Sequence, residues 1–438
     1  MYQVFLLVAS IVLILLLISK IRLHTFLTLL LMSLILGVAA GLPLRDVATL
    51  VAAGFGGIMQ SIGIVIICGV VIGEVLEATG GARKIAGAIM RLVSKKRAPL
   101  AAGVTGGVVS VPVFCDSGFV ILSPVIKAIS RDSKIPMMCM ASALMMGLLA
   151  THCLVPPTPG PIAAAALLNA DLGLVMLYGL ALSVPVIFFT SLWCNSKYLR
   201  NKYPDLAEVE TTSVQQTDET KMPSTFLSFM PIVVPILLIV ARSFLNQYAD
   251  PELTLVVFMH FIGTPYIALL IGVGISFLLP KKISHEVTET WVGNSIRRTA
   301  EILVTTGIAG SFGRILQNTG VGDIMANAIL QIGLPSILLP FFISSIVLIA
   351  QGSATVALTT TAAIVAPMLG TLGLSPELAV LAIGAGSFTG VFPNGSYFWC
   401  VTKMSGFDIK KGYVAVTATT FVMGGVALVC LIGLSFFI

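Results

Sequence analysis

Long apolar runs dominate this chain, and polar residues interrupt two of them near the middle. Hydrophobic residues make up 57% of the 438 positions and charged residues only 10%. A run of about 20 apolar residues crosses a bilayer as a helix. The chain is therefore predicted to be an all-α polytopic membrane protein. Ten runs are long enough to span, at 2–19, 23–44, 52–79, 136–167, 172–196, 226–249, 253–279, 299–320, 376–402 and 412–438.

Composition and motifs argue against several other classes of protein. The net charge of +6 comes from Lys and Arg at the ends of apolar runs, as the positive-inside rule describes, so no nucleic-acid partner is expected. The seven cysteines show no paired metal-ligand spacing. No P-loop is found, so neither a cofactor nor a metal is expected. The N-terminal run lacks the basic flank and cleavage site of a signal peptide, which predicts an uncleaved helix.

The basic residues predict how the two interrupted runs, 98–126 and 335–374, enter the membrane. If both are re-entrant hairpins and the N-terminus is outside, 22 of the 25 Lys and Arg residues lie on the cytoplasmic side. If 98–126 crossed instead, its following basic residues would move outside and every later loop would be inverted. The prediction is ten spans plus two hairpins, with both termini outside.

The two halves of the chain repeat one order of elements: three spans, a hairpin, a broken span and a last span. Residues 73–80 match 313–320 at an offset of 240, and Ser117 corresponds to Ser353 at an offset of 236. Five crossings per half is an odd number, so the second copy is inverted, as in many secondary transporters. The predicted boundaries are 1–199 for the first repeat, 200–225 for a cytoplasmic linker and 226–438 for the second repeat.

The interruptions of the two hairpins are the first candidate binding elements. Irregular backbone at membrane depth persists only where protein or a water-filled cavity surrounds it. A helix starts at each interruption, and its free N–H groups and positive dipole end favour an anion there. Kinks filled by small residues are the alternative, but occurrence in both halves favours a carboxylate clamp. Its expected residues are Asp116, Ser117, Gly118, Gly352, Ser353 and Thr355.

Two further interruptions fall in the broken spans. Four prolines within 156–161 cannot remain in a helix. In the second half, Asn394 has an amide that can both donate and accept a hydrogen bond. Unwinding without ligand contact is the alternative for both. The residues expected to line the site here are Thr158, Gly160, Asn394 and Ser396.

Three ionisable residues are candidates for proton coupling: Asp116, His152 and Glu74. A carboxylate in the membrane is costly and suggests function, yet Asp116 could also bind substrate without titrating. His152 could titrate near neutral pH, but a lone histidine in a helix is more often a packing residue. Arg242 and Arg314 are expected near the outer interface, and no Arg is obviously placed to pair with a substrate.

The chain resembles the gluconate permease (GntP) family over essentially its whole length. The residues that carry the resemblance are 114–119, 156–161, 163–166, 169–171, 352–357 and the Phe-Trp pair at 398–399. The resemblance implies proton symport of gluconate or related hydroxy acids, or of D-serine in one branch, and a homodimer with a hairpin-bearing moving part. Thr158 and Gly395 replace a His and an Asp usual in the family, which makes a shorter acid such as glycerate an alternative.

The predicted function is a bacterial inner-membrane symporter, elevator-type, that imports a small hydroxycarboxylate with a proton. Sodium coupling is an alternative, because carbonyls freed at broken helices can hold Na⁺. A channel would not need two inverted carboxylate clamps. An enzyme is not expected, since no nucleophile or metal constellation is recognisable.

Overall fold

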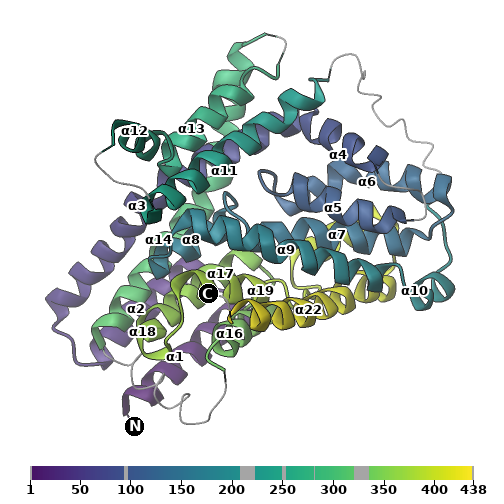
Figure 1. Cartoon of the computed structure of the whole chain (residues 1–438). Coiled ribbons are helices and arrows are strands. Elements are labelled where there is room, and N and C mark those ends of the chain that lie inside the picture. The colour runs from purple at the N-terminus through teal and green to yellow at the C-terminus, as the bar shows by residue number, and fades with distance from the viewer. Residues whose placement is uncertain are drawn as a thin grey trace.

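The computed structural model describes residues 2–92, 97–207, 222–248, 253–280, 282–319 and 335–436, and regular structure in these ranges is helical throughout (Figure 1). This confirms the all-α class. The first half contains α1 (Tyr2–Ser19), α2 (Thr25–Ala39), α3 (Leu44–Ala78), α4 (Gly81–Leu92), α5 (Ala98–Val109), α6 (Cys115–Ser133), α7 (Met137–Leu154), α8 (Pro159–Leu168), α9 (Leu172–Cys194) and α10 (Lys197–Lys202).

The second half follows the linker. It contains α11 (Thr225–Tyr248), α12 (Thr254–Ile262), α13 (Pro265–Ser276), the π-helix η3 (Glu286–Trp291), α14 (Val292–Thr319), α16 (Leu338–Gln351), α17 (Ala354–Val365), η4 (Ala366–Met368), α18 (Leu369–Leu372), α19 (Pro376–Gly386), α20 (Ser396–Met404), α21 (Ile409–Gly412), η5 (Tyr413–Ala418) and α22 (Thr419–Leu434).

Six helical segments in these ranges are long and apolar enough to cross a membrane, or seven if the bent pair α12–α13 is one span. The predicted span 253–279 is therefore not a straight helix: its two parts are bent by 67°. Pro265 explains the bend, because its ring disfavours a helical conformation at Thr264 and removes a backbone donor.

The helix α3 is longer than the apolar run that predicted it. The run began at 52, whereas the helix begins at Leu44 and contains 35 residues, which is about 52 Å of helix. Arg45 and Asp46 lie in its first turn, and because both are charged, the apolar run does not include this part of the helix. Asp46 is well placed there, since an acidic side chain stabilises the positive end of the helix dipole.

The helices α3 and α14 cross closely and form the largest helix contact of the first half with the second. A side chain at Gly54 would collide with the backbone of Gly310 and Ser311, so the absence of a Cβ allows the approach. Ser311 Oγ donates a hydrogen bond to the Val51 carbonyl at 2.6 Å. Small residues and hydroxyl groups are the usual means of helix packing in a membrane.

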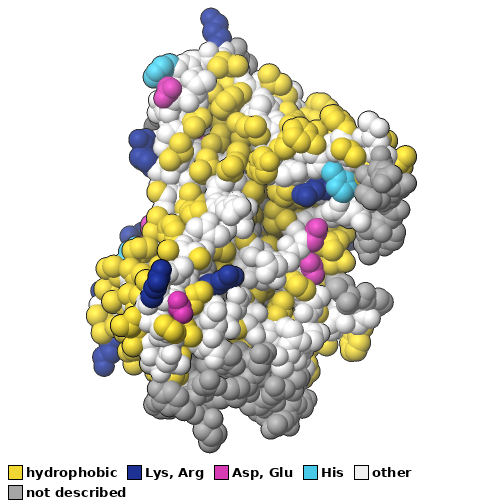
Figure 2. Space-filling view, turned by 90° about the vertical axis from the view of Figure 1, so that its left-hand side faces the viewer, with side chains coloured by type: hydrophobic (Ala, Val, Ile, Leu, Met, Phe, Trp, Pro, Cys, Tyr) yellow, Lys and Arg dark blue, Asp and Glu magenta, His cyan; other side chains and the backbone are white. Residues whose placement is uncertain are grey.

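Hydrophobic side chains predominate on the face of the molecule in Figure 2.

The helix α7 lies at the centre of the molecule. All of its residues are buried, and it contacts α5, α6 and α9 from its own half. Residues 322–332 and most of the predicted linker 200–225 lie outside the described residues.

Candidate functional site

The first break separates α5 from α6 at residues 110–114, so it ends just before the predicted ligands, which lie inside α6. Asp116 and Ser117 lie in the first turn of α6, and both are partly buried. The backbone of the break packs against α3, where a side chain at Gly73 would collide with the Pro112 carbonyl oxygen. Gly118 is buried against the side chain of Leu148 in α7. The free N–H groups of α6 thus begin at a fixed position beside α3 and α7.

The third break, between α7 and α8, adjoins the first. The Pro156–Pro157 peptide bond is cis, and Thr158 Oγ1 donates to the Val155 carbonyl at 2.7 Å. The Pro157 carbonyl oxygen lies against Gly69, one turn before Gly73 on α3. Two glycines of one helix therefore accommodate two breaks. The rings of Phe114 and His152, with centroids 6.1 Å apart, connect these breaks directly.

The second and fourth breaks contact each other. Gly352, at φ +82°, ends α16, and Ser353 accepts a hydrogen bond from the Val356 N–H at the start of α17. Gly352 and Gly395 pack backbone to backbone, so that a side chain on either would collide with the other. Asn394 Nδ2 donates to the Ile349 carbonyl at 2.9 Å, which leaves the amide oxygen of this exposed residue available.

Contacts across the two halves complete a ring of four breaks. Cys400 in α20, one turn after Ser396, donates to the Asp116 carbonyl oxygen at 3.6 Å. A side chain at Gly160, at the start of α8, would meet Leu358 of α17. The predicted ligand Thr355 lies in the first turn of α17, and Ser396 is the exposed first residue of α20. All ten predicted ligands thus lie at adjoining breaks.

Buried polar atoms without partners also lie in this ring. They are Asp116 Oδ1, His152 Nδ1 and, at the second break, Gln351 Nε2. A buried polar atom that makes no hydrogen bond costs about 1–3 kcal/mol. A ligand, a proton or water at the breaks could remove that cost, so the ring has unused capacity to bind.

Glu74, the third coupling candidate, lies outside the ring in an ion-pair cluster. Its Oε2 is 2.8 Å from Arg298 Nη1 of α14, without hydrogen-bond geometry, and Asn294 Nδ2 donates to its Oε1 at 3.4 Å. The same Arg298 Nη1 lies 3.4 Å from Glu77 Oε2. Glu77 lies near Ser117, which follows Asp116 in α6. The cluster therefore joins α14 to α3 close to the first break.

Sequence reasoning missed Arg298 and Glu77. Arg298 precedes the apolar run 299–320, yet it lies in α14 and is the cation that pairs with the carboxylates of α3. The available signal was the spacing of Glu74 and Glu77, which places two carboxylates on one face of α3 and calls for a nearby cation. Among the described residues, no cluster of three or more His, Cys, Asp or Glu could hold a metal ion.

The sequence matches the family described as "GntP family permease" over residues 2–437. This chain belongs to that family. The resemblance found in the motifs is thereby confirmed, and the protein is a multi-pass membrane permease rather than an enzyme.

Two relatives and one solved structure are similar to this GntP permease over most of its length. An "Uncharacterized permease" of Haemophilus influenzae is 35% identical over 430 residues, covering 94% of this chain and 87% of the relative. A "High-affinity gluconate transporter" of Escherichia coli is 31% identical, covering 89% of each chain. The YdaH transporter of Alcanivorax borkumensis has a similar fold: the TM-score is 0.68 at 16% identity, covering 94% of this chain and 99% of the other.

Proposed function

We propose that this GntP permease imports a small hydroxycarboxylate by proton symport, and that the substrate binds within the ring of breaks. The observation that carries the proposal is that two helices, α6 and α17, each start at a break. Contacts of α20 with α6 and of α8 with α17 connect these breaks to the other two. Helix N-termini offer free N–H groups and partial positive charge, which suit a carboxylate. The hydroxyl groups of Ser117, Ser353 and Thr355 suit the hydroxyl groups and carboxylate of such an acid.

The substrate class follows from the family and from two substitutions. Gluconate-like sugar acids are supported by the relative that carries a gluconate name. Thr158 and Gly395 stand where the family usually has His and Asp, so the site lacks two groups that could bind a long polyol. A shorter acid such as glycerate, or D-serine, then becomes the second choice within the same class.

Asp116 is the proposed proton carrier. An ionised Asp116 beside a substrate carboxylate would be repelled, because like charges in a poorly screened site cost several kcal/mol. Protonation removes the repulsion, so substrate and proton bind with positive coupling. By reciprocity, the substrate then favours the protonated form. The unpaired Oδ1 of Asp116 supports this role, since no donor among the described residues fixes the charged form there.

The proposed architecture is two inverted repeats, 1–199 and 226–438, with ten spans, two re-entrant hairpins and both termini outside. The hairpins and broken helices would move as one body against α3 and α14, in an elevator-type cycle. A homodimer in the inner membrane is the proposed assembly, as the family resemblance implies.

The test is a thermal-shift screen of the purified protein against gluconate, glycerate and D-serine, followed by uptake into proteoliposomes. A substrate binding the native state raises the unfolding temperature by mass action. A proton gradient in sodium-free buffer should drive accumulation. Accumulation that requires sodium would replace the proton by Na⁺, and no saturable uptake of any of the three acids would overturn the proposal.

The role of Asp116 is tested with Asp116→Asn. Wild-type affinity for the identified acid should weaken as the pH rises, and the variant should lose that dependence. In proteoliposomes the variant should exchange the acid across the membrane without concentrating it. If it still accumulates the acid on a proton gradient, Asp116 only positions the substrate, and His152 or Glu74 becomes the candidate carrier.

A further inference from the structure

We propose that a second carboxylate-binding site lies at Arg314, in a cavity separate from the ring of breaks. The inference rests on the proposed function for the identity of the acid, but the site itself is defined by geometry. In the proposed topology this end of α14 faces outside. The site would therefore capture the acid before it reaches the breaks.

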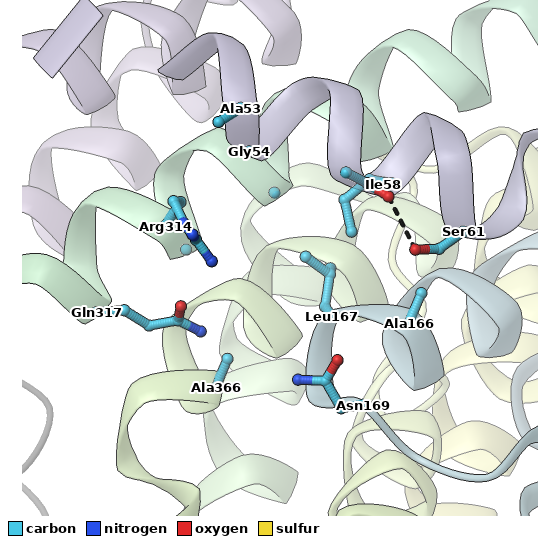
Figure 3. A pocket seen from close by; sticks show the side chains of 13 residues that line it. Ala53, Gly54, Ile58, Ser61, Ala166, Leu167, Asn169, Arg314, Gln317 and Ala366 are labelled. Atoms are coloured by element: carbon cyan, nitrogen blue, oxygen red, sulfur yellow. Dashed lines mark hydrogen bonds between the residues drawn. The ribbon is translucent and has the colours of Figure 1, made fainter. Parts of the chain in front are cut away.

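The cavity has a volume of about 190 Å³ and lies between α3, α14, the end of α8 and η4. A water molecule occupies about 30 Å³, so there is room for several waters or a small acid. Arg314 and Gln317 extend from α14, Asn169 from the end of α8, and Ser61 from α3 (Figure 3). Their polar groups surround the space from three sides. This combination of a cation with amide and hydroxyl groups suits a hydroxycarboxylate.

Arg314 is available for a ligand. It makes no ion pair with any residue in the described ranges, and it is exposed. At the end of α8, the carbonyls of Ala166 and Ala165 already accept hydrogen bonds from the N–H groups of Asn169 and Ala170. The Ser61 hydroxyl donates to the Gly57 carbonyl at 2.8 Å, so its oxygen can still accept a hydrogen bond.

The other end of the α3–α14 pair shows what this end lacks. At the 240-residue offset, Glu74 aligns with Arg314, and Arg298 aligns with Ile58. Glu74 and Arg298 form an ion pair at 2.8 Å. Ile58 and Arg314 line the same cavity. The equivalent pair therefore has one charge instead of two, and an external anion can take the place of the missing carboxylate.

The cavity is distinct from the breaks. The helix α8 runs from the third break to the cavity and has 10 residues, about 15 Å of helix. The helix α17 starts at the second break and leads to η4, whose Ala366 also lines the cavity. Both helices begin at the ring and end at the cavity, so the two sites are one helix length apart and joined by rigid elements.

The first experiment needs no substrate. A thiol introduced by Ser61→Cys is labelled with two methanethiosulfonates of similar size, one anionic (sulfonatoethyl) and one cationic (trimethylammonioethyl). The parent chain gives the background of the natural cysteines, most of which are buried. A unit charge about 10 Å away in water changes each rate about twofold in opposite directions, so Arg314→Gln should lower the anion-to-cation rate ratio roughly fourfold. Arg314→Lys should preserve the ratio.

Arg45→Gln is the matched control, because Arg45 is an exposed arginine of α3 that does not line the cavity. It should leave the ratio unchanged. An unchanged ratio in Arg314→Gln, or an equal fall in Arg45→Gln, would overturn the site.

The second experiment separates this inference from the proposed function. In proteoliposomes, Arg314→Gln should raise the KM for gluconate or glycerate at least fivefold, and Arg314→Lys should restore most of it. If wild type transports the acid and Arg314→Gln has an unchanged KM, the Arg314 site is wrong and the proposed function stands. If no acid is transported but the rate ratio depends on Arg314, the cavity attracts anions and the proposed function is wrong.

Discussion

The two ends of the α3–α14 helix pair use similar packing for different purposes. At one end, Arg298 is held between Glu74 and Glu77, and the polar groups are occupied by one another. At the other end, Arg314 faces a polar cavity without an acidic partner in the described ranges. A balanced cluster stabilises a helix contact, whereas an unbalanced charge leaves capacity for a ligand. This difference predicts that Arg298→Gln mainly lowers stability, whereas Arg314→Gln mainly weakens anion binding.

The largest expected effect is that of Arg298→Gln on stability. It leaves Glu74, whose side chain is only 9% exposed, without its cation. Removing one partner of a buried pair costs about 3–5 kcal/mol, and because Arg298 is 44% exposed we expect about 2–3 kcal/mol less unfolding free energy. Thermal unfolding in detergent measures the change.

Two variants control this result. Arg297→Gln removes a neighbouring exposed arginine that donates to the Asn294 side-chain oxygen rather than to Glu74, and it should change stability by less than about 0.5 kcal/mol. Adding Glu74→Gln to Arg298→Gln should recover most of the loss, because the uncompensated charge is removed. Equal effects of Arg298→Gln and Arg297→Gln would mean that the cluster does not stabilise the helix pair.

The serines at the first and second breaks should both contribute to substrate binding, but only Ser353 should also contribute to stability. Ser117→Ala and Ser353→Ala should each weaken binding of the transported acid at least tenfold, since a hydrogen bond to a charged ligand contributes about 1.5–3 kcal/mol. Ser353 also caps α17, so its replacement should cost about 1 kcal/mol of stability in addition. Ser117 has no such capping role.

Titration calorimetry and thermal unfolding separate these two effects. Unchanged affinity in both variants would remove the carboxylate clamp from the proposal. A loss of stability in Ser117→Ala equal to that in Ser353→Ala would show that Ser117 also has a structural role.

A smaller effect is expected where α3 meets the first break. Gly73→Ala places a methyl group on the Pro112 carbonyl oxygen, and the backbone must shift. Overpacking of this kind costs about 1–3 kcal/mol. Gly56→Ala is the control on the same helix: nothing lies within 4 Å of the added carbon, so it should be neutral or stabilising by up to about 1 kcal/mol. Equal unfolding temperatures would argue against a close contact at Gly73.

The helical class and the positions of interruptions could be predicted from the sequence, because both depend on local chemistry. Apolar runs define spans, and the prolines and glycines at 156–161 and 352 define interruptions wherever the chain lies. The start of α3 was missed because Arg45 and Asp46 are helical but not apolar. The bend at Pro265 was missed because hydropathy does not show the direction of a helix axis.

The partners of charged residues could not be predicted in the same way. Arg298 lies 224 positions from Glu74, and only the crossing of α3 and α14 brings the two together. Arg314 was expected at the membrane interface with its side chain extended to water. Its place in a polar cavity depends on where α8 ends, which no local pattern of α14 encodes.

The smallest expected effect is that of Arg314→Gln on stability. Arg314 has no ion pair in the described ranges, so its removal leaves no buried carboxylate there without a partner. We expect a change below about 0.5 kcal/mol in unfolding free energy, matched by Arg45→Gln. Thermal unfolding without added acid measures it. A loss as large as that of Arg298→Gln would make Arg314 a structural cation, and the two ends of the helix pair would then be alike. A small loss together with weaker stabilisation by gluconate or glycerate would mean that the charge at this end serves the ligand, because the fold does not need it.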